Sequence, residues 1–453
     1  MSDQDRVYLN VTTSWHWRRP PVGIVRVERE LARYLRTSQL ETRYCVLDAS
    51  GREFVELTRT EVDNLLADGW CTTAGSVARH DAPSRPPGTR GVRSLVGRFV
   101  RRLPSAGVIY RQARRYVGAR ARRMKPAGSD GVRELSRRAV VSPGARDYFV
   151  SVGLDWEYGL EPILALKRRS GVTIILGCHD TIPVDFPEVS SKARNEVFQE
   201  YFLRLAQVAD RIFAVSQTTK AHLEHLYRRS GLLEWPAIAA LPLGCQEPGA
   251  ARSGDGDPSD FEFRKRLEAL RSGQGFVLYV STIEARKNHR VLVQVWQDLY
   301  QQYGSDIPGL VFVGMIGWGV GDFMEELRCS EIYTRGLILV LDRVSDEELA
   351  VLYRTCLFSV FPSMCEGWGL GAVEAMSHGK VCVISSAPAL VEATQGLCLS
   401  LHPFDFLGWR DVVTRYWKNP ALRQAAESRM QETFSIRTWA AFGRDFELFL
   451  RKP

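Results

Sequence analysis

The stretch Cys365–Met376, CEGWGLGAVEAM, places three glycines at alternate positions and two glutamates eight residues apart. Glycine lets a backbone approach a ligand closely and adopt dihedral angles that other residues avoid. The helix predicted after the glycines would direct its N–H groups and positive dipole end toward an anion such as a phosphate. A carboxylate would repel a phosphate, so Glu366 and Glu374 are better suited to accept hydrogen bonds from sugar or ribose hydroxyls.

A phosphate with a hydroxyl-rich group on each side describes a nucleotide sugar. Glycines of this pattern also occur in ordinary turns, and glutamates are common on surfaces. The flanking strand and helix are what favour a binding site here. An apolar run, LFSVFPS, precedes the motif, and a helical pattern, AVEAMSHG, follows it. Ligands of open parallel sheets bind where such strands end. The stretch therefore predicts a nucleotide-sugar site.

Short apolar runs alternate with helical patterns in two parts of the chain, which is typical of parallel sheets with helical crossovers. The first part contains VYLNVT, the helical VGIVRVERELARYLRT, RYCVLDA, DYFVSVG, TIILGCHD, RIFAVS and AIAALPLG. The second part contains FVLYVST, LVFVGMIG, ILVLDRV, LFSVFPS and KVCVIS. We therefore expect an α/β protein with two doubly wound, Rossmann-like domains and a ligand in the cleft between them.

The domain boundaries follow from composition and from the length of 453 residues. The stretch CQEPGAARSGDGDPSD is rich in Gly, Pro, Ser and Asp, as linkers are. We expect an N-terminal domain over residues 1–246, a linker over 247–272 and a C-terminal domain over 273–433. A last helix within 434–453 is expected to pack back on the N-terminal domain.

The net charge of +8 comes from one segment, because residues 85–125 hold thirteen Arg or Lys and no Asp or Glu. Arginines interleaved with apolar residues suit basic amphipathic helices on an anionic membrane, where each Arg contributes about 1 kcal/mol. A solvated insertion and a nucleic-acid site are the alternatives. Few aromatic residues are available there to stack on bases, so no nucleic acid is expected. The interleaved apolar residues are Leu95, Val96, Phe99, Val100 and Leu103.

Other patterns speak against metals and membrane spans. No apolar run approaches the roughly 18–20 residues that a bilayer requires, and the N-terminus does not resemble a signal peptide. The nine cysteines form no CxxC pair, and the D-x-D pattern, Asp255-Gly-Asp257, falls in the linker. His222 and His225 lack partner ligands. No metal or cofactor is expected, and the expected location is the cytoplasm, at the inner face of the plasma membrane if the basic segment docks there.

The glycine-rich stretch resembles the E-x7-E motif of the retaining glycosyltransferases of family 4. The stretch VSTIEARKNHRVLVQVW is similar to the start of that family's nucleotide domain. Three others, VGIVRVERELARYL, CHDTIPVDFPE and ADRIFAVSQTTKAHL, are similar to parts of its N-terminal domain. The resemblance covers most of the chain except about residues 53–146. It implies the GT-B fold, in which two Rossmann-like domains face each other across a cleft.

The resemblance also implies roles for single residues. Arg286 and Lys287 match the basic pair that grips the donor diphosphate, and fixed cations stabilise the charge that develops on this leaving group. Glu374 matches the glutamate that binds the ribose, and Glu366 matches the one that contacts the donor sugar. Gly23 matches a loop glycine that approaches the diphosphate. The expected donor-binding residues are Gly23, Thr282, Arg286, Lys287, Glu366, Gly367, Trp368, Gly369, Leu370, Gly371 and Glu374.

His179, at the end of TIILGCHD, matches a histidine near the transferred sugar, and Asp180 could orient it or contact the acceptor hydroxyl. The family mechanism implies retention at the anomeric carbon, with the leaving phosphate accepting the acceptor proton and no protein nucleophile. In an inverting enzyme Asp180 would be the general base, and this alternative stays open. The expected catalytic residues are His179, Asp180, Glu366, Arg286 and Lys287.

We therefore expect a retaining transferase of a hexose-type sugar, with GDP-mannose as the first candidate donor beside UDP-sugars and dTDP-rhamnose. The expected acceptor is a lipid-linked or growing polysaccharide such as O-antigen or capsule. The sequence departs from the family pattern at Gly371, Trp368 and Val22, which bears on donor identity. The alternative is a non-catalytic subunit that binds nucleotide sugar or scaffolds an assembly complex. An epimerase or a phosphorylase of the same fold is a further rival, although no pyridoxal-phosphate lysine motif is present.

Overall fold

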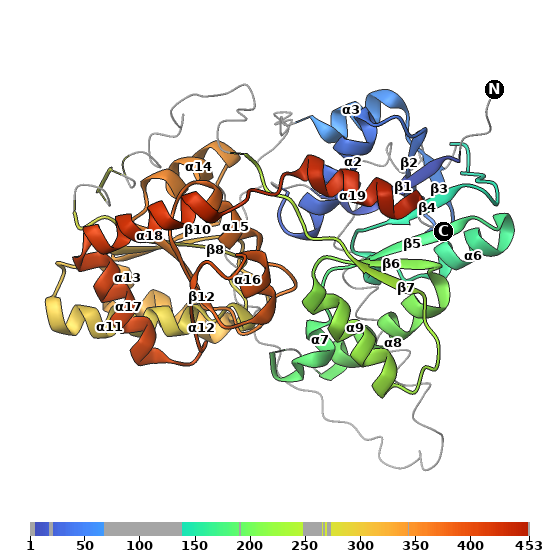
Figure 1. Cartoon of the computed structure of the whole chain (residues 1–453). Coiled ribbons are helices and arrows are strands. Elements are labelled where there is room, and N and C mark those ends of the chain that lie inside the picture. Colours follow the sequence, from blue (N-terminus) through green and yellow to red (C-terminus); the bar gives the residue numbers. More distant parts are fainter. Residues whose placement is uncertain are drawn as a thin grey trace, which may run out of the picture. The chain divides into compact units, whose positions relative to one another are not determined.

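The computed structural model describes residues 5–17, 21–67, 138–189, 192–247, 265, 268–269, 273–342 and 344–451 (Figure 1). The basic segment at residues 85–125 lies outside these ranges, as does the Asp255-Gly-Asp257 pattern of the expected linker. The described residues form two sheets, each with its own helices.

The first sheet has seven strands in the order β3-β2-β1-β4-β5-β6-β7. All neighbours pair in parallel except β3, which is antiparallel to β2. The apolar runs predicted every strand but β3, which is three residues long. The strands are β1 (Val7–Asn10), β2 (Thr42–Leu47), β3 (Phe54–Glu56), β4 (Tyr148–Ser151), β5 (Thr173–Cys178), β6 (Arg211–Ala214) and β7 (Ala237–Ala240).

The second sheet has six strands in the order β10-β9-β8-β11-β12-β13, and every pair is parallel. Its five predicted strands are confirmed, and the short edge strand β13 was missed. The strands are β8 (Phe276–Val280), β9 (Gly309–Val313), β10 (Ile338–Leu341), β11 (Phe358–Phe361), β12 (Cys382–Ser385) and β13 (Leu399–Leu401).

Helices connect the parallel strands, because a parallel pair requires a long crossover. In the first half they are α1 (Thr12–His16), α2 (Ile24–Thr37), α3 (Arg59–Leu66), α6 (Glu161–Ser170), α7 (Ile182–Asp185), α8 (Lys192–Val208) and α9 (Gln217–Arg229). In the second half they are α11 (His289–Tyr303), α12 (Gly321–Cys329), α13 (Glu331–Thr334), α14 (Asp346–Thr355), α15 (Leu370–Ser377) and α16 (Pro388–Ala393). Three further helices follow the last strand: α17 (Phe406–Lys418), α18 (Pro420–Thr433) and α19 (Trp439–Arg451).

The last helix, α19, packs on α2 and the first sheet (Figure 1). A Cβ atom at Gly443 would lie 2.1 Å from the Tyr34 ring, so glycine permits this close approach. Phe446 is fully buried, with its ring centroid 5.7 Å from that of Phe213 in β6. Within the described ranges, no helix has both the length and the apolar character needed to cross a bilayer.

Candidate functional site

The glycine-rich stretch lies between β11 and α15, the strand and helix that its flanking sequence predicts. Gly369 is the N-terminal cap residue of α15 and has a φ of 128°, a value that favours glycine. No side chain caps this helix end, which leaves it suited to an anion. A Cβ atom at Gly371 would lie 2.7 Å from the Val280 carbonyl oxygen, so glycine allows α15 to pack against the end of β8.

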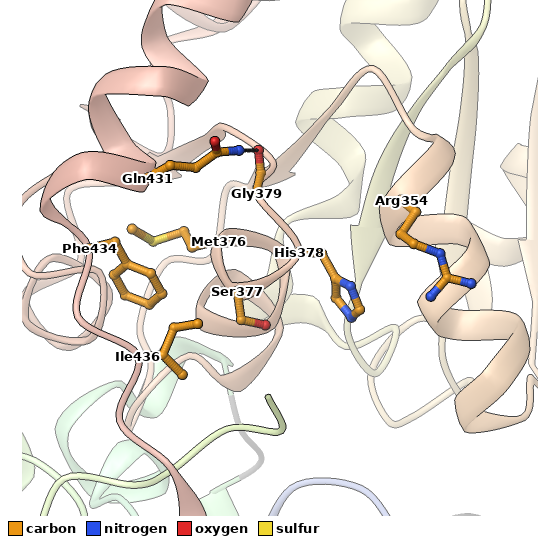
Figure 2. A pocket seen from close by; sticks show the side chains of 8 residues that line it. All are labelled: Arg354, Met376, Ser377, His378, Gly379, Gln431, Phe434 and Ile436. Atoms are coloured by element: carbon orange, nitrogen blue, oxygen red, sulfur yellow. Dashed lines mark hydrogen bonds between the residues drawn. The ribbon is translucent and has the colours of Figure 1, made fainter. Parts of the chain in front are cut away.

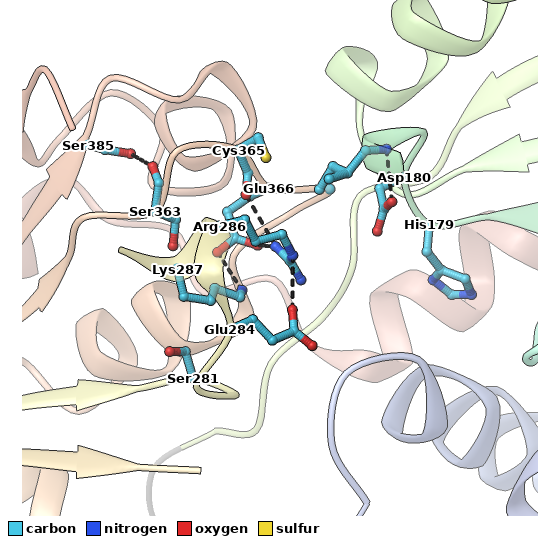
Figure 3. A network of polar contacts seen from close by, with 12 residues as sticks. His179, Asp180, Ser281, Glu284, Arg286, Lys287, Ser363, Cys365, Glu366 and Ser385 are labelled. Atoms are coloured by element: carbon cyan, nitrogen blue, oxygen red, sulfur yellow. Dashed lines mark hydrogen bonds and ion pairs between the residues drawn. The ribbon is translucent and has the colours of Figure 1, made fainter. Parts of the chain in front are cut away.

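Two cations converge on Glu366 (Figure 3). Arg286 and Lys287 lie in the 3-10 turn after β8, and Lys287 Nζ is 2.5 Å from Glu366 Oε1. Arg286 Nη1 lies 3.0 Å from Glu366 Oε2, and Arg286 Nε donates to Glu284 Oε2 at 3.1 Å. The Glu366 side chain is only 9% exposed. The structure thus brings together three residues that are up to 80 positions apart in sequence.

The charges of this cluster support one another. Burial alone would raise the pKa of Glu366, but Lys287 and Arg286 outweigh it and lower that pKa to about 2. Burial and the neighbouring Arg286 lower the pKa of Lys287, and Glu366 opposes this effect. A bound phosphate would favour the charged lysine further, because nearby opposite charges stabilise the charged form. Both cations already have carboxylate partners, so a diphosphate has to share or replace those contacts.

The loop around Gly367 contacts residues that follow strands β5 and β6 of the first sheet. The Gly367 carbonyl accepts hydrogen bonds from Ser216 Oγ at 2.8 Å and from Thr219 Oγ1 at 3.2 Å. A Cβ atom at Gly367 would lie 1.9 Å from the His179 carbonyl oxygen. The contact between this loop and the end of β5 therefore requires glycine.

His179 and Asp180 follow β5, but they have separate partners. His179 Nε2 donates to the Val152 carbonyl at 2.7 Å, because a carbonyl can only accept. Burial lowers the pKa of His179, which favours the neutral ring with a lone pair on Nδ1. Asp180 Oδ1 accepts from the Ile182 N–H at 3.0 Å. The Val152 carbonyl, rather than Asp180, thus orients the His179 ring.

Glu374 lies in α15, and both of its carboxylate oxygens have partners. Oε1 accepts from Arg26 Nη1 at 2.8 Å, and Oε2 accepts from the Tyr353 hydroxyl at 3.2 Å. Burial raises the pKa of Glu374, while Arg26 opposes that rise. Arg26 belongs to α2, 348 positions earlier in the chain.

The remaining predicted donor-binding residues differ in exposure. Gly23 is exposed at the N-terminal end of α2, where its φ is 51° and no side chain caps the helix. Thr282 is half-buried in the loop after β8. Trp368 is buried in an apolar cluster that also contains Trp439 of α19, and Leu370 packs against the same cluster.

Sequence reasoning missed several residues of this arrangement. Arg26, Tyr353 and Ser216 contact predicted site residues, yet no motif spacing distinguishes them. The available signal for Arg26 was its place near the start of an apolar helical stretch, three residues after Gly23. Its partner could not be identified, because Glu374 is remote in sequence.

A separate cavity of about 350 Å³ lies at the opposite end of α15 (Figure 2). It contains none of the predicted donor-binding residues. Its lining residues are Arg354, Met376, Ser377, His378, Gly379, Gln431, Phe434 and Ile436. The cavity is therefore distinct from the ion cluster around Glu366. Among the residues that the structure describes, no group of three His, Cys, Asp or Glu side chains is arranged to hold a metal ion.

Known proteins resemble the chain in fold. Sucrose-phosphate synthase from Thermosynechococcus elongatus superposes with a TM-score of 0.60 over 99% of this chain and 98% of that one, at 16% identity. At this identity the likeness shows the fold alone. The two Rossmann-like domains thus have the GT-B fold, as the family resemblance implied.

Two of the sequence relatives are mannosyltransferases of Escherichia coli. "O-antigen chain mannosyltransferase B" is 31% identical over 261 residues, which cover 55% of this chain and 63% of that protein. "Serotype-specific mannosyltransferase WbdA" is 28% identical over 235 residues, which cover 50% of this chain and 28% of WbdA. The chain thus spans less than two thirds of the length of either relative. The family model described as "Glycosyl transferases group 1" matches residues 260–395. The chain therefore contains a domain of the glycosyl transferases group 1 family.

Proposed function

We propose that the chain transfers a sugar from a nucleoside-diphosphate donor to a glycan acceptor. The observation that carries the proposal is the cluster of Arg286, Lys287 and Glu366 near the uncapped N-terminus of α15. Cations and helix N-termini bind phosphates, and carboxylates accept hydrogen bonds from hydroxyl groups. The glycosyl transferases group 1 domain supports the same reading.

Donor binding would rearrange the contacts of this cluster. The diphosphate takes over donors of Arg286 and Lys287, which frees lone pairs on Glu366 for the hydroxyls of the sugar. With its pKa near 2, Glu366 remains ionised at neutral pH and can act only as an acceptor. When the sugar departs, the two cations stabilise the charge that develops on the diphosphate.

Glu374 would bind the nucleoside end of the donor. Its carboxylate is fixed by Arg26 and Tyr353, and each oxygen retains a lone pair for a ribose hydroxyl. Gly23 begins α2, the helix that carries Arg26, and its uncapped end offers further N–H groups to the diphosphate. In this arrangement Glu374 would bind the ribose, the start of α2 and the two cations would bind the diphosphate, and Glu366 would bind the sugar.

We propose transfer with retention. The bond from the anomeric carbon to the diphosphate breaks, the acceptor oxygen forms the new bond on the same face, and its proton passes to the leaving diphosphate. No protein nucleophile is required. The neutral His179 ring would contact the transferred sugar through Nδ1. An inverting reaction would use Asp180 as the general base, and the anomeric configuration of the product distinguishes the two.

The proposed sugar is mannose, supplied by GDP-mannose, because both relatives are named mannosyltransferases. The proposed acceptor is a growing or polyprenyl-linked polysaccharide of the O-antigen or capsule type. The basic segment at residues 85–125 would hold the enzyme on the anionic inner face of the plasma membrane, near such an acceptor.

The test uses the purified full chain with GDP-mannose, UDP-glucose or dTDP-rhamnose, a mannose-terminated synthetic acceptor, and EDTA. Release of the nucleoside diphosphate is measured, and the product anomer is assigned by NMR. We expect turnover with one donor and its loss in Lys287→Ala. Binding of a nucleotide sugar without turnover of any acceptor would favour the non-catalytic alternative, and no binding at all would refute the proposal.

A further inference from the structure

Arg26 joins three segments through three different nitrogens. Nη1 lies 2.8 Å from Glu374 Oε1 in α15, and Nη2 lies 2.7 Å from Asp346 Oδ1 at the start of α14. Nε donates to the Pro21 carbonyl at 3.2 Å, in the loop that precedes Gly23. The planar guanidinium makes all these bonds in one fixed geometry. It therefore ties the start of α2 to the carboxylate expected to bind ribose.

The surroundings of Glu374 disfavour its ionised form, which the Arg26 cation stabilises. Its carboxylate is 13% exposed and faces the Tyr353 hydroxyl and the Asp346 carboxylate, both from α14. Burial and the nearby Glu374 carboxylate raise the pKa of the Cys245 thiol. Burial and a second carboxylate both disfavour the ionised form. The Arg26 guanidinium lies in direct contact with Glu374 and opposes both effects.

We propose that Arg26 is a positioning residue for the donor, one that holds the charged Glu374 carboxylate so that its remaining lone pairs accept the ribose hydroxyls. This inference rests on the proposed function. In this role Arg26 acts through Glu374, and it does not need to touch the sugar or the reacting atoms. Its contacts with Asp346 and Pro21 fix the guanidinium, which in turn fixes the direction of the Glu374 oxygens.

A pH dependence follows from this role. Burial raises the pKa of Glu374, and Arg26 opposes the rise. Without Arg26 the pKa rises further, so Glu374 takes up a proton at a higher pH and loses acceptor capacity for hydroxyls. Donor affinity should then fall as the pH falls and recover as the pH rises and Glu374 ionises again.

The test is calorimetric titration of the full chain with GDP and UDP between pH 6 and pH 9. For Arg26→Ala we expect binding about 10- to 100-fold weaker at pH 6.5, the range for hydrogen bonds to a charged acceptor, with recovery toward pH 9. Arg26→Lys keeps a positive charge but not the planar geometry, so it should restore the pH profile and only part of the affinity at pH 7. Glu374→Gln should bind weakly at every pH.

Two controls separate positioning from a general structural effect. Arg36→Ala removes another arginine of α2, whose partner is Asp63, and should leave binding unchanged. Asp346→Ala loosens α14 but leaves the Arg26–Glu374 pair, so its pH profile should not become steeper. Failure of the unaltered chain to bind any nucleotide would overturn the proposed function together with this inference. Equal binding by the unaltered chain and by folded Arg26→Ala and Arg26→Lys at every pH would overturn the role of Arg26 alone.

Discussion

Replacing Gly367 with alanine tests the contact between the glycine-rich loop and the end of β5. The added Cβ atom would lie 1.9 Å from the His179 carbonyl oxygen and 3.1 Å from the Asp180 Cβ atom. The first neighbour is a backbone atom, so no side-chain rotation relieves the overlap. The loop has to move, and Glu366 moves with it because it is the adjacent residue.

The size of that movement follows from ordinary contact distances. Carbon and oxygen atoms that are not bonded rarely approach closer than about 3 Å, so the loop must retreat by about 1 Å. A shift of this size in a catalytic group can lower the rate by about 100-fold. The hydrogen bonds from Ser216 and Thr219 to the Gly367 carbonyl would also lengthen, at about 1 kcal/mol each.

The assay is donor turnover at saturating acceptor, together with a thermal unfolding curve to verify that the variant folds. The matched control is Gly321→Ala in α12, where an added Cβ atom meets nothing within 4 Å. That control should retain full turnover, and its helical alanine should not destabilise the chain. A folded Gly367→Ala variant with unchanged kcat/KM would refute the role assigned to this contact.

Two stability predictions follow from buried carboxylates. The pKa of Glu366 is about 2 rather than the usual 4.5, so its contribution to the free energy of unfolding is present above about pH 5 and is lost on acidification. Urea unfolding should show that about 2 kcal/mol of this free energy has been lost by pH 3. Glu366→Gln should abolish this loss. Burial raises the pKa of Glu28 to about 7, so its stabilising protonated form is lost as the pH rises from 4.5 through 7. The free energy of unfolding of Glu28→Gln, relative to that of the unaltered chain, should therefore rise by up to about 3 kcal/mol between pH 5 and pH 8. A difference between the two proteins that does not change with pH would contradict this.

Most strands of both sheets could be predicted because each of these is a short apolar run bounded by polar or turn residues. β11 illustrates this, since all four of its residues are buried. The runs missed were β3 and β13, each three residues long at a sheet edge. Two of the three residues of β13 are exposed, so it lacks the apolar signal of a central strand.

The site could be predicted as a set of motifs but not as a set of contacts. The family resemblance implied that Arg286, Lys287 and Glu366 act at one ligand. It did not predict that both cations pair with Glu366, because that depends on side-chain conformations and on the balance between burial and charge. The burial of Glu28 could have been predicted from the sequence, because it lies three residues after Val25 on the buried face of α2.

The central claim is that Lys287 and Glu374 belong to one nucleoside-diphosphate site, and direct binding tests it most simply. Calorimetric titration of the unaltered chain with GDP, UDP, dTDP, ADP and CMP would be compared with Lys287→Ala, Glu374→Ala and Arg354→Ala. Arg354 lines the separate cavity and is the control. We predict that one nucleoside diphosphate binds, that Lys287→Ala and Glu374→Ala weaken it at least about 10-fold, and that Arg354→Ala does not. Binding that survives both site variants but is lost in Arg354→Ala, or no binding at all, would contradict the account.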